Sequence, residues 1–199
     1  LVASHDGEMT TGFEVKDGSS EDEIDVNIGN GAASNTTVSG KLLTADGGAA
    51  LPSHSFSGDP NTGMFSNAAD IIGFSTGGTE RMRVTTNCVG FGVIPEAWGS
   101  NADAIQLGNT GMLFGQNNAN ALTVGSNFYW DNTNYKRIDA DLPSRHVQFQ
   151  GEHIFSHAVT GSADTNITWV ESLRIKSSGN VGIGTTAINA RLDIDGAGG

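Results

Sequence analysis

The sequence has few cysteines, few basic residues and no long apolar run. Cys88 is the only cysteine among 199 residues, which excludes an intrachain disulfide framework. No run of about 18 apolar residues occurs, so no membrane-spanning helix is predicted. Lysine and arginine number 10 against 22 acidic residues, giving a net charge of −12. Nucleic acids and anionic membranes bind clustered positive charge, so neither is an expected partner.

Uninterrupted helix-forming stretches are also lacking. The chain has 28 glycines and a hydrophobic fraction of 37%. Glycine and asparagine interrupt nearly every window that could form a helix, whereas short alternating segments bounded by turn residues are common. This composition predicts an all-β fold of short strands and hairpins, with too few apolar residues for one thick core.

The stretch 171–185 is the most informative one. It contains two short strand patterns joined by a Ser-Ser-Gly-Asn turn, and its second strand alternates β-branched residues with glycine. Val181 and Ile183 therefore share one face, while Gly182 and Gly184 leave the other face bare. A strand this poor in apolar surface is not stable alone, and glycine lets another backbone approach closely. We therefore predict a narrow fibre in which identical chains intertwine, so that no folded monomer is expected.

An earlier stretch, 80–93, matches this pattern with a turn one residue shorter. In both stretches an acid precedes the strand, an arginine stands before its last apolar residue, and an x-Gly-x-Gly segment closes the unit. Two divergent copies of one unit indicate a repeat architecture, in which each unit buries its apolar face against neighbours.

These motifs carry a family resemblance. The segments 58–65, 69–84 and 179–186 resemble the repeated modules of bacteriophage tail-fibre and tailspike proteins. Many such proteins end in a self-cleaving intramolecular chaperone domain, which is not visible here, and Ala187 stands where the family usually has proline. The resemblance covers residues 58–93 and 170–195 well and the first 57 residues hardly at all.

The resemblance implies a structural, non-enzymatic role. It implies a homotrimeric stalk in the virion tail fibre that serves host attachment and is assembled in the host bacterial cytoplasm without a secretion leader. Expected partners are other tail or baseplate proteins and a host surface glycan. Alternatives are the stem of a polysaccharide-degrading tailspike, a capsid-attached fibre or decoration protein, and a bacterial adhesin stalk.

The chain is predicted to contain four segments. Residues 1–52 form an acidic N-terminal β segment and linker, and residues 53–93 a β-hairpin repeat module. Residues 94–138 form a β module with an aromatic cluster, and residues 139–199 a C-terminal β repeat module. Within the first segment, 13–15, 24–28 and 36–43 alternate as strands. The third begins with Pro95-Glu96-Ala97-Trp98, which could form one helical turn.

The hairpin of the second segment has two plausible registers. A two-residue turn at residues 77–78 would place Phe74 opposite Arg81, mixing charge with apolar side chains. A three-residue loop, which adds the preceding residue, places Ile72 opposite Met82 and separates the faces. The buried face decides the register of a hairpin, so we predict the three-residue loop.

The densest aromatic cluster lies in residues 128–136 and contains the candidate receptor contacts Tyr129, Trp130 and Tyr135. Exposed aromatic rings beside Asp and Asn suit the faces and hydroxyls of a saccharide. The alternative is that the three rings pack across the strands of a hairpin. Trp98 and Trp169 are expected in an interchain core.

No catalytic, cofactor-binding or metal-ligating residue is predicted. Gly182 to Ala187 formally match a dinucleotide fingerprint, but no βαβ unit can follow. Residues 59–63 are explained by a turn rather than a calcium loop, because Met64 replaces the required glycine. His153 and His157 lie about 13 Å apart on a strand and cannot share a metal within one chain, although each could form a ring of three on a trimer axis.

Overall fold

The structure is a computed structural model that describes residues 2–5, 8–11, 13–17, 24–28 and 35–196. The chain divides into two compact units, Leu1–Thr44 and Ala45–Gly199. The boundary between the two units therefore lies at Thr44, whereas the sequence predicted the first segment to end at residue 52. The residues that follow Thr44 pair within the second unit. Gly47 forms a bridge with Pro52, and Asp46 accepts a hydrogen bond from the backbone of Ser66.

The first unit contains two antiparallel hairpins, β1 (Val2–His5) with β2 (Glu8–Thr11) and β3 (Phe13–Asp17) with β4 (Ile24–Ile28). The strands predicted at 13–15 and 24–28 are therefore confirmed. The acidic run 21–23 lies outside the described residues. The strand predicted at 36–43 is wrong, because that segment pairs with no other strand and is exposed throughout.

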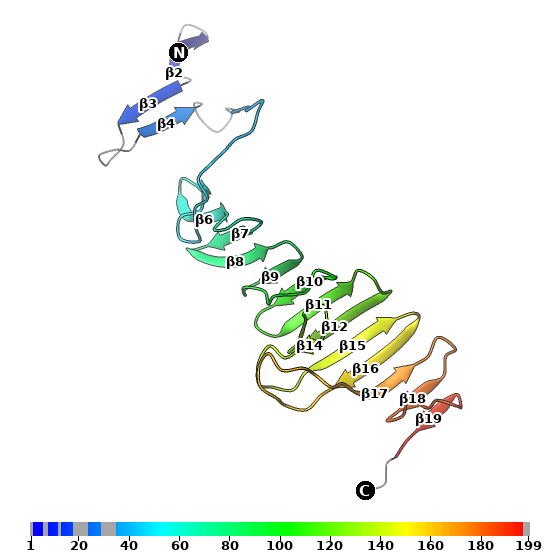
Figure 1. The fold of residues 1–199 in the computed structure, drawn as a ribbon. Helices are drawn as coiled ribbons and strands as arrows, with labels where there is room; N and C mark the ends of the chain where they lie inside the picture. Colours follow the sequence, from blue (N-terminus) through cyan, green and yellow to red (C-terminus); the bar gives the residue numbers. More distant parts are fainter. Residues whose placement is uncertain (1, 6–7, 12, 18–23, 29–34, 197–199) are drawn as a thin grey trace. The chain divides into compact units, whose positions relative to one another are not determined.

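The second unit is built on one sheet of 13 strands, counted over the described residues (Figure 1). Its first seven strands are β5 (His54–Phe56), β6 (Asp59–Phe65), β7 (Ile72–Thr76), β8 (Thr79–Val84), β9 (Cys88–Phe91), β10 (Ala102–Leu107) and β11 (Gly111–Gln116). The others are β12 (Ala121–Ser126), β15 (Ser144–Phe149), β16 (Glu152–His157), β17 (Val170–Ile175), β18 (Val181–Ile183) and β19 (Leu192–Ile194). Between β12 and β15, β13 (Tyr129–Trp130) pairs with β14 (Tyr135–Lys136) as a separate ribbon.

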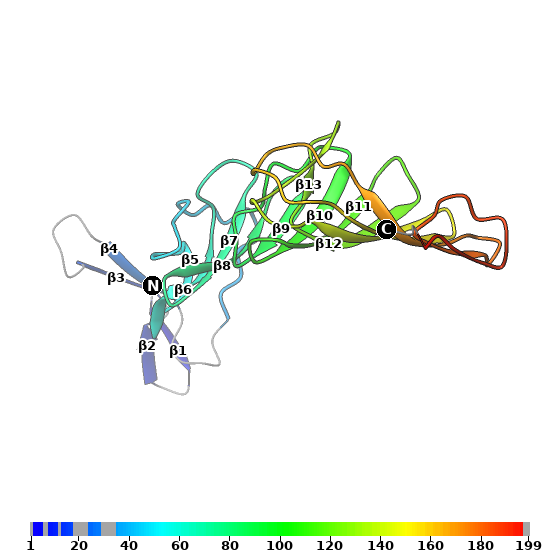
Figure 2. The same cartoon turned by 90° about the horizontal axis from the view of Figure 1, so that it is seen from below.

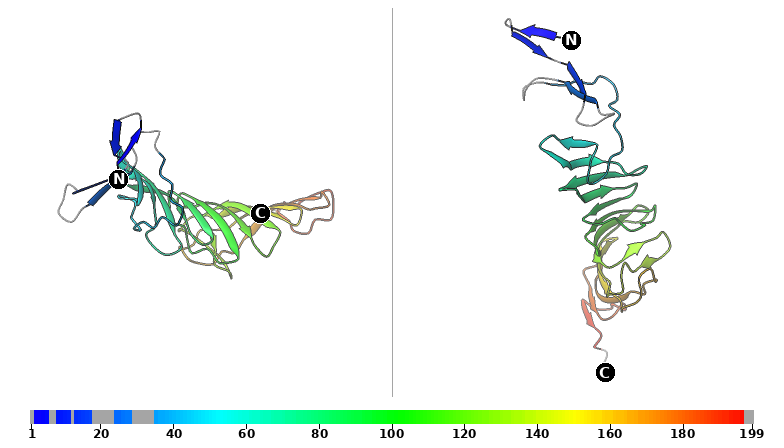
Figure 3. Two further views of the ribbon diagram at one scale, coloured as in Figure 1. Left: turned by 90° about the horizontal axis from the view of Figure 1, so that it is seen from above. Right: turned by 90° about the vertical axis from the view of Figure 1, so that its left-hand side faces the viewer.

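The strands of the large sheet follow one another in chain order, as the ladder in Figure 3 shows. All neighbours are antiparallel except β9 with β10 and β18 with β19, which are parallel and need a crossover connection. The described residues contain no helix, so the all-β prediction is confirmed for them. The helical turn predicted at residues 95–98 is wrong, because this segment crosses over between β9 and β10 in irregular conformation.

The hairpin of β7 and β8 has a two-residue turn at Gly77-Gly78, so the predicted three-residue loop is wrong. The sheet keeps apolar side chains opposite one another by a bulge in β8. Arg81 is the extra residue of this bulge and has no partner on β7. Past the bulge, the opposed pairs are Phe74 with Met82 and Ile72 with Val84. Apolar side chains thus oppose each other as the buried-face argument required, through a bulge instead of a longer loop.

Residues 59–63, predicted as a turn, belong to β6. The turn itself falls at residues 57–58, and Phe56 pairs with Asp59. The next pair is Ser55 with Gly63, so the three residues between have no partner on β5. Pro60 lacks an N–H donor, which suits this unpaired position.

The β8–β9 and β17–β18 hairpins place the same residue types in matching positions. In β8 the guanidinium of Arg83 donates to both carboxylate oxygens of Glu80, at 2.6 and 2.7 Å. In β17 Arg174 donates likewise to Glu171, at 2.9 and 2.6 Å. A bulge residue between acid and arginine brings side chains three apart onto one face in both strands. A two-pronged bond of this kind is stronger than a single ion pair.

The glycines opposite these arginines are covered by the same chain, not by a neighbouring copy. A Cβ at Gly90 would lie 2.7 Å from Pro95, and one at Gly182 would lie 2.6 Å from Ile188 and 2.8 Å from the carbonyl oxygen of Thr185. The sequence correctly indicated close approach at Gly182. It assigned that approach to another chain, because nothing in the local pattern says which segment returns over the strand.

We expect Gly182→Ala to lower the free energy of unfolding by about 1–3 kcal/mol, because the methyl group overlaps Ile188 and backbone. Gly58→Ala is the matched control, since a Cβ there meets no atom within 4 Å and the residue lies in the turn between β5 and β6. That control should stabilise the chain by about 0.5–1 kcal/mol through the loss of glycine entropy. Thermal unfolding measures both, and equal effects would contradict the close packing over Gly182.

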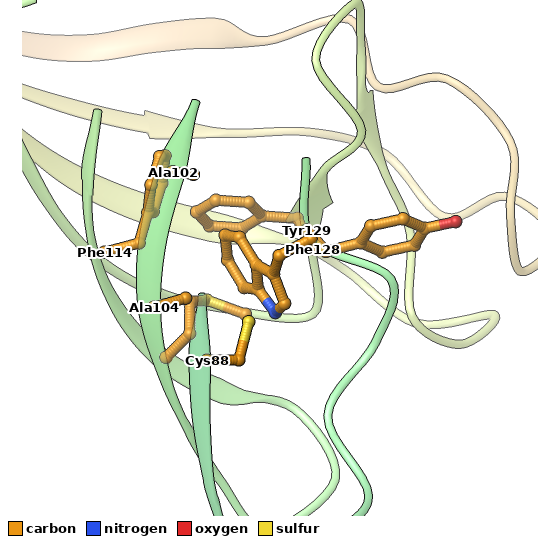
Figure 4. Close-up of a cluster of buried hydrophobic side chains, with 8 residues drawn as sticks. Cys88, Ala102, Ala104, Phe114, Phe128 and Tyr129 are labelled. Carbon is orange, nitrogen blue, oxygen red and sulfur yellow. The ribbon is translucent and has the colours of Figure 1, made fainter. Parts of the chain in front are cut away.

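The core of the second unit lies on one face of the sheet, over β9 to β12 (Figure 4). Loops that include β13 cover this face, as Figure 2 shows. The buried cluster consists of Cys88, Trp98, Ala102, Ala104, Met112, Phe114, Phe128 and Tyr129. The prediction of an interchain position for Trp98 and Trp169 is wrong, because Trp98 packs on Phe114 and Trp169 on Phe128 of the same chain, each pair with ring centroids 5.1 Å apart.

Candidate functional site

The other face of the sheet carries a continuous line of aligned side chains. Residues directly opposite each other on paired strands share a face, so the strand registers define the line. We call it the apolar row, and it consists of Ile72, Val84, Val89, Ile105, Leu113, Val124, His146, Phe155, Leu173, Ile183 and Ile194. A shorter parallel line runs beside it through Met64, Phe74, Met82, Phe91 and Leu107.

Five of the eleven members of the apolar row are exposed within the chain, and the other six are half-buried. Val124 is 48% exposed, Phe155 41% and Ile194 61%, although all three are apolar. Neither line contains an Asp, Glu, Lys or Arg side chain. Apart from His146 the row is apolar, and exposed Asp103 is the nearest acidic side chain on β10, two residues from Ile105. An apolar surface that crosses eleven strands far exceeds the scattered exposed apolar residues of an ordinary monomer, and such patches mark interaction surfaces.

The apolar row is hollowed near its middle. A depression of about 420 Å³ is lined mainly by β8 to β12 and includes Val89, Ile105 and Leu113. Gly115 lies beside it, and a Cβ at this position would meet no atom within 4 Å. The hollow is open and mainly apolar, although Asp103 also lines it, so it fits a protruding apolar side chain better than a polar ligand.

The predicted receptor contacts lie on the covered side of the sheet. Tyr129 is 8% exposed, and its hydroxyl donates a 2.8 Å hydrogen bond to Oδ1 of Asp164. In Figure 4 its ring points away from Phe114, toward the outside of the cluster. Burial, followed by the hydrogen bond to Asp164 and the charge of that carboxylate, raises the pKa of the Tyr129 phenol. The hydroxyl is therefore a fixed neutral donor within the loops.

Trp130 and Tyr135 are partly buried and face each other across the small ribbon, with ring centroids 4.8 Å apart. The guanidinium of Arg145 lies 4.7 Å from the centre of the Tyr135 ring and 4.1 Å from that of Trp169. These contacts match the alternative of rings packed across a hairpin. The structure brings the three predicted residues together, and receptor contact by their exposed edges stays a prediction.

Asp131 closes the turn between Trp130 and Tyr135. Its Oδ1 accepts hydrogen bonds from the backbone N–H groups of Asn134 at 2.7 Å and Thr133 at 2.8 Å. Its Oδ2 lies 3.6 Å from Nζ of Lys136. The backbone donors, and then the lysine, hold the pKa of Asp131 below its ordinary value of 3.8. The turn is thus stabilised by an ionised carboxylate.

This lowered pKa predicts an acid-sensitive turn. The contribution of Asp131 to stability is fully present above pH 3.8 and is lost as the pH falls through the lower pKa of the folded state. Asp131→Asn keeps an oxygen acceptor but removes the charge, so its unfolding temperature should fall less steeply between about pH 5 and pH 2 than that of the parent. Parallel curves for the two proteins would contradict the role of the charge.

Other groups with chemical potential do not assemble into a site. Burial raises the pKa of the Cys88 thiol to about 11, so it stays protonated at neutral pH and acts as a packing residue. Among the side chains that the structure describes, no group of three or more His, Cys, Asp or Glu gathers around a point. In the same residues, no helix is long and apolar enough to cross a bilayer.

Sequence reasoning missed the length of the apolar row and one histidine pair. The row was present in the sequence as alternating apolar residues, but only the pairing order shows that each strand continues the line of the last. His146 lies on β15 beside His153 on β16, with Nε2 and Nδ1 3.1 Å apart. The hairpin register of β15 and β16 is the signal that could have revealed this pair.

Comparison with known proteins adds no assignment. No protein-family model matches the chain, and no curated protein matches it. Function therefore has to be inferred from the geometry of the chain itself.

Proposed function

We propose that this chain is a structural, non-enzymatic segment of a bacteriophage tail fibre. Three copies would form a stalk that serves host attachment, with tail or baseplate proteins at one end and a host glycan as the surface it meets. The observation that carries this proposal is the apolar row, a mainly apolar surface that extends across eleven strands and is partly exposed in the single chain.

A second and a third copy of the chain are the partners that fit the row. A partner that covers the whole row must itself offer an uncharged apolar surface of the same length. Another copy has such a surface by definition, and symmetric self-association is the commonest way to bury one. Fully burying one Val, Leu, Ile or Phe side chain contributes about 1.5–3 kcal/mol, so the row supplies a large driving force.

The matched hairpins support the repeat nature of the stalk. We infer that β8–β9 and β17–β18 descend from one repeated unit, since each contains an acid, a bulge, an arginine and a glycine at equivalent positions. Each hairpin is followed by a parallel strand, β10 or β19. Such units extend a sheet in one direction while keeping the apolar row continuous, which suits a stalk.

The proposed trimer would not depend wholly on contacts between chains for its stability. The aromatic core around Phe128 is completed within one chain, so interchain contacts would add to an existing fold. We therefore expect the trimer to be the stable form while a dissociated chain keeps its aromatic core. The sequence alone predicted that no folded monomer exists.

Two measurements test the proposed function. Sedimentation of the purified chain should give a mass near three times 20.6 kDa, about 62 kDa. Antibodies against the chain should label tail appendages of the virions whose genome encodes it, as seen by electron microscopy with gold particles. Label confined to the capsid would favour the decoration-protein alternative, and release of oligosaccharides from host polysaccharide would favour a tailspike.

A further inference from the structure

The hairpin of β15 and β16 brings two imidazoles together on the open face of the sheet. Nε2 of His146 lies 3.1 Å from Nδ1 of His153, and the ring planes differ by 17°. The ring centroids are 5.4 Å apart, so the rings lie side by side with one nitrogen edge facing the other. Two imidazole nitrogens at this distance share one proton or one metal ion.

The separation of the two nitrogens fits a shared metal ion. Imidazole nitrogens bind Zn²⁺ at about 2.0–2.1 Å. Two such nitrogens that subtend an angle between about 90° and 109° at the metal are about 2.9–3.4 Å apart. The observed 3.1 Å lies within this range. The two nitrogens face each other along the line between the rings, so each ring has to turn by about 35–45° through its side-chain torsions to aim its lone pair at one ion.

The scaffold holds the two rings in place. All six residues of β15 pair with β16, with His146 opposite Phe155 and His153 opposite Gln148. The ring of His146 stacks on Phe155 with centroids 4.3 Å apart and planes 3° apart. The paired strands fix the backbone positions of both ligands, so only side-chain torsions have to change when an ion binds.

The surroundings select the class of ion. Glu152 is on the other face of the sheet, where Oε2 accepts a 2.7 Å hydrogen bond from Arg174. No carboxylate is aligned with His146 or His153 on the strands paired with β15 and β16, so Ca²⁺ and Mg²⁺ lack their preferred ligands there. Imidazole suits Zn²⁺, Ni²⁺ and Cu²⁺. His153 is exposed and His146 is half-buried, so water can complete the coordination.

We propose that His146 and His153 form a two-imidazole binding site for a divalent transition-metal ion. The ion bridges β15 and β16 and replaces the proton that otherwise joins the two rings. Both ligands belong to one chain, so the site does not need a second copy, but copies that cover the apolar row would compete with the ion for it. The site lies within the apolar row, so an ion there would add charge to the surface proposed to bind other copies.

The test is metal binding by the full chain with Zn²⁺ or Cu²⁺ as the only probe. Isothermal titration should give one Zn²⁺ per chain, and His146→Gln or His153→Gln should weaken binding at least about tenfold. His157→Gln is the matched control, because His157 lies on the same strand and contacts Oγ of Ser172 at 2.8 Å instead. It should leave the affinity unchanged. Equal losses in all three variants, or no binding by the parent, would overturn the proposal.

A spectroscopic measurement on the unaltered chain does not depend on how the variants fold. Electron paramagnetic resonance of bound Cu²⁺ should show coupling to two imidazole nitrogens, falling to one in His153→Gln. Coupling to a single nitrogen in the parent would mean that the pair does not chelate. Sedimentation with and without Zn²⁺ in the same samples separates this result from trimer formation, since a monomeric chain that binds the ion supports the metal site and contradicts the stalk.

Discussion

Val124→Glu is expected to convert the proposed trimer into monomers without unfolding the chain. Val124 lies near the middle of the apolar row, between Leu113 and His146, and is 48% exposed in the single chain. In the monomer the new carboxylate would stay in water. In the trimer each copy would bury one, at a cost of several kcal/mol per ion. The association constant should therefore fall by at least about a hundredfold.

The measurement combines sedimentation with tryptophan fluorescence. Asn118→Glu is the matched control, because Asn118 lies exposed in the turn between β11 and β12 and adds the same charge away from the row. That control should sediment like the parent. The Val124→Glu monomer should keep the parent emission wavelength, because Trp98 packs on the opposite face of the sheet. A Val124→Glu protein that remains trimeric would mean that the copies meet elsewhere.

The sequence could predict where strands lie, but it could not predict which face of the sheet is buried. Strands β3 and β4 were correctly predicted within a few residues, because alternation of apolar and polar side chains is a local signal. Which face becomes buried is not local. It depends on Trp98, Phe128 and Trp169, which come together only when loops far apart in sequence return over one side.

The pairing register of neighbouring strands was the second feature that the sequence could not fully predict. The sequence correctly demanded that apolar side chains oppose one another in β7 and β8, but it could not choose between a longer loop and a bulge at Arg81. The histidine pair shows the opposite case. The turn at Gln150-Gly151 has positive φ at both residues, 51° and 81°, as a two-residue hairpin turn requires. Given that turn, counting back along the two strands places His146 diagonally beside His153.

Phe128→Ala is expected to have the largest effect on stability of any single substitution considered. Phe128 is fully buried, and its ring lies 5.1 Å from Trp169, 5.7 Å from Tyr135 and 6.0 Å from Phe114, measured between ring centroids. Removing it leaves a cavity beneath the loops, so the free energy of unfolding should fall by about 3–5 kcal/mol. For a unit of this size the unfolding temperature should fall by about 6–20 °C.

Phe56→Ala is the control for the loss of an aromatic ring, because Phe56 is 66% exposed on the edge strand β5. It should change the free energy of unfolding by less than about 0.5 kcal/mol. The decisive comparison places Phe128→Ala in the monomeric Val124→Glu protein. The two side chains lie on opposite faces, so their effects should be nearly additive. If Phe128→Ala has no effect in the monomer, the aromatic core is not formed by the single chain, and the stalk depends entirely on contacts between copies.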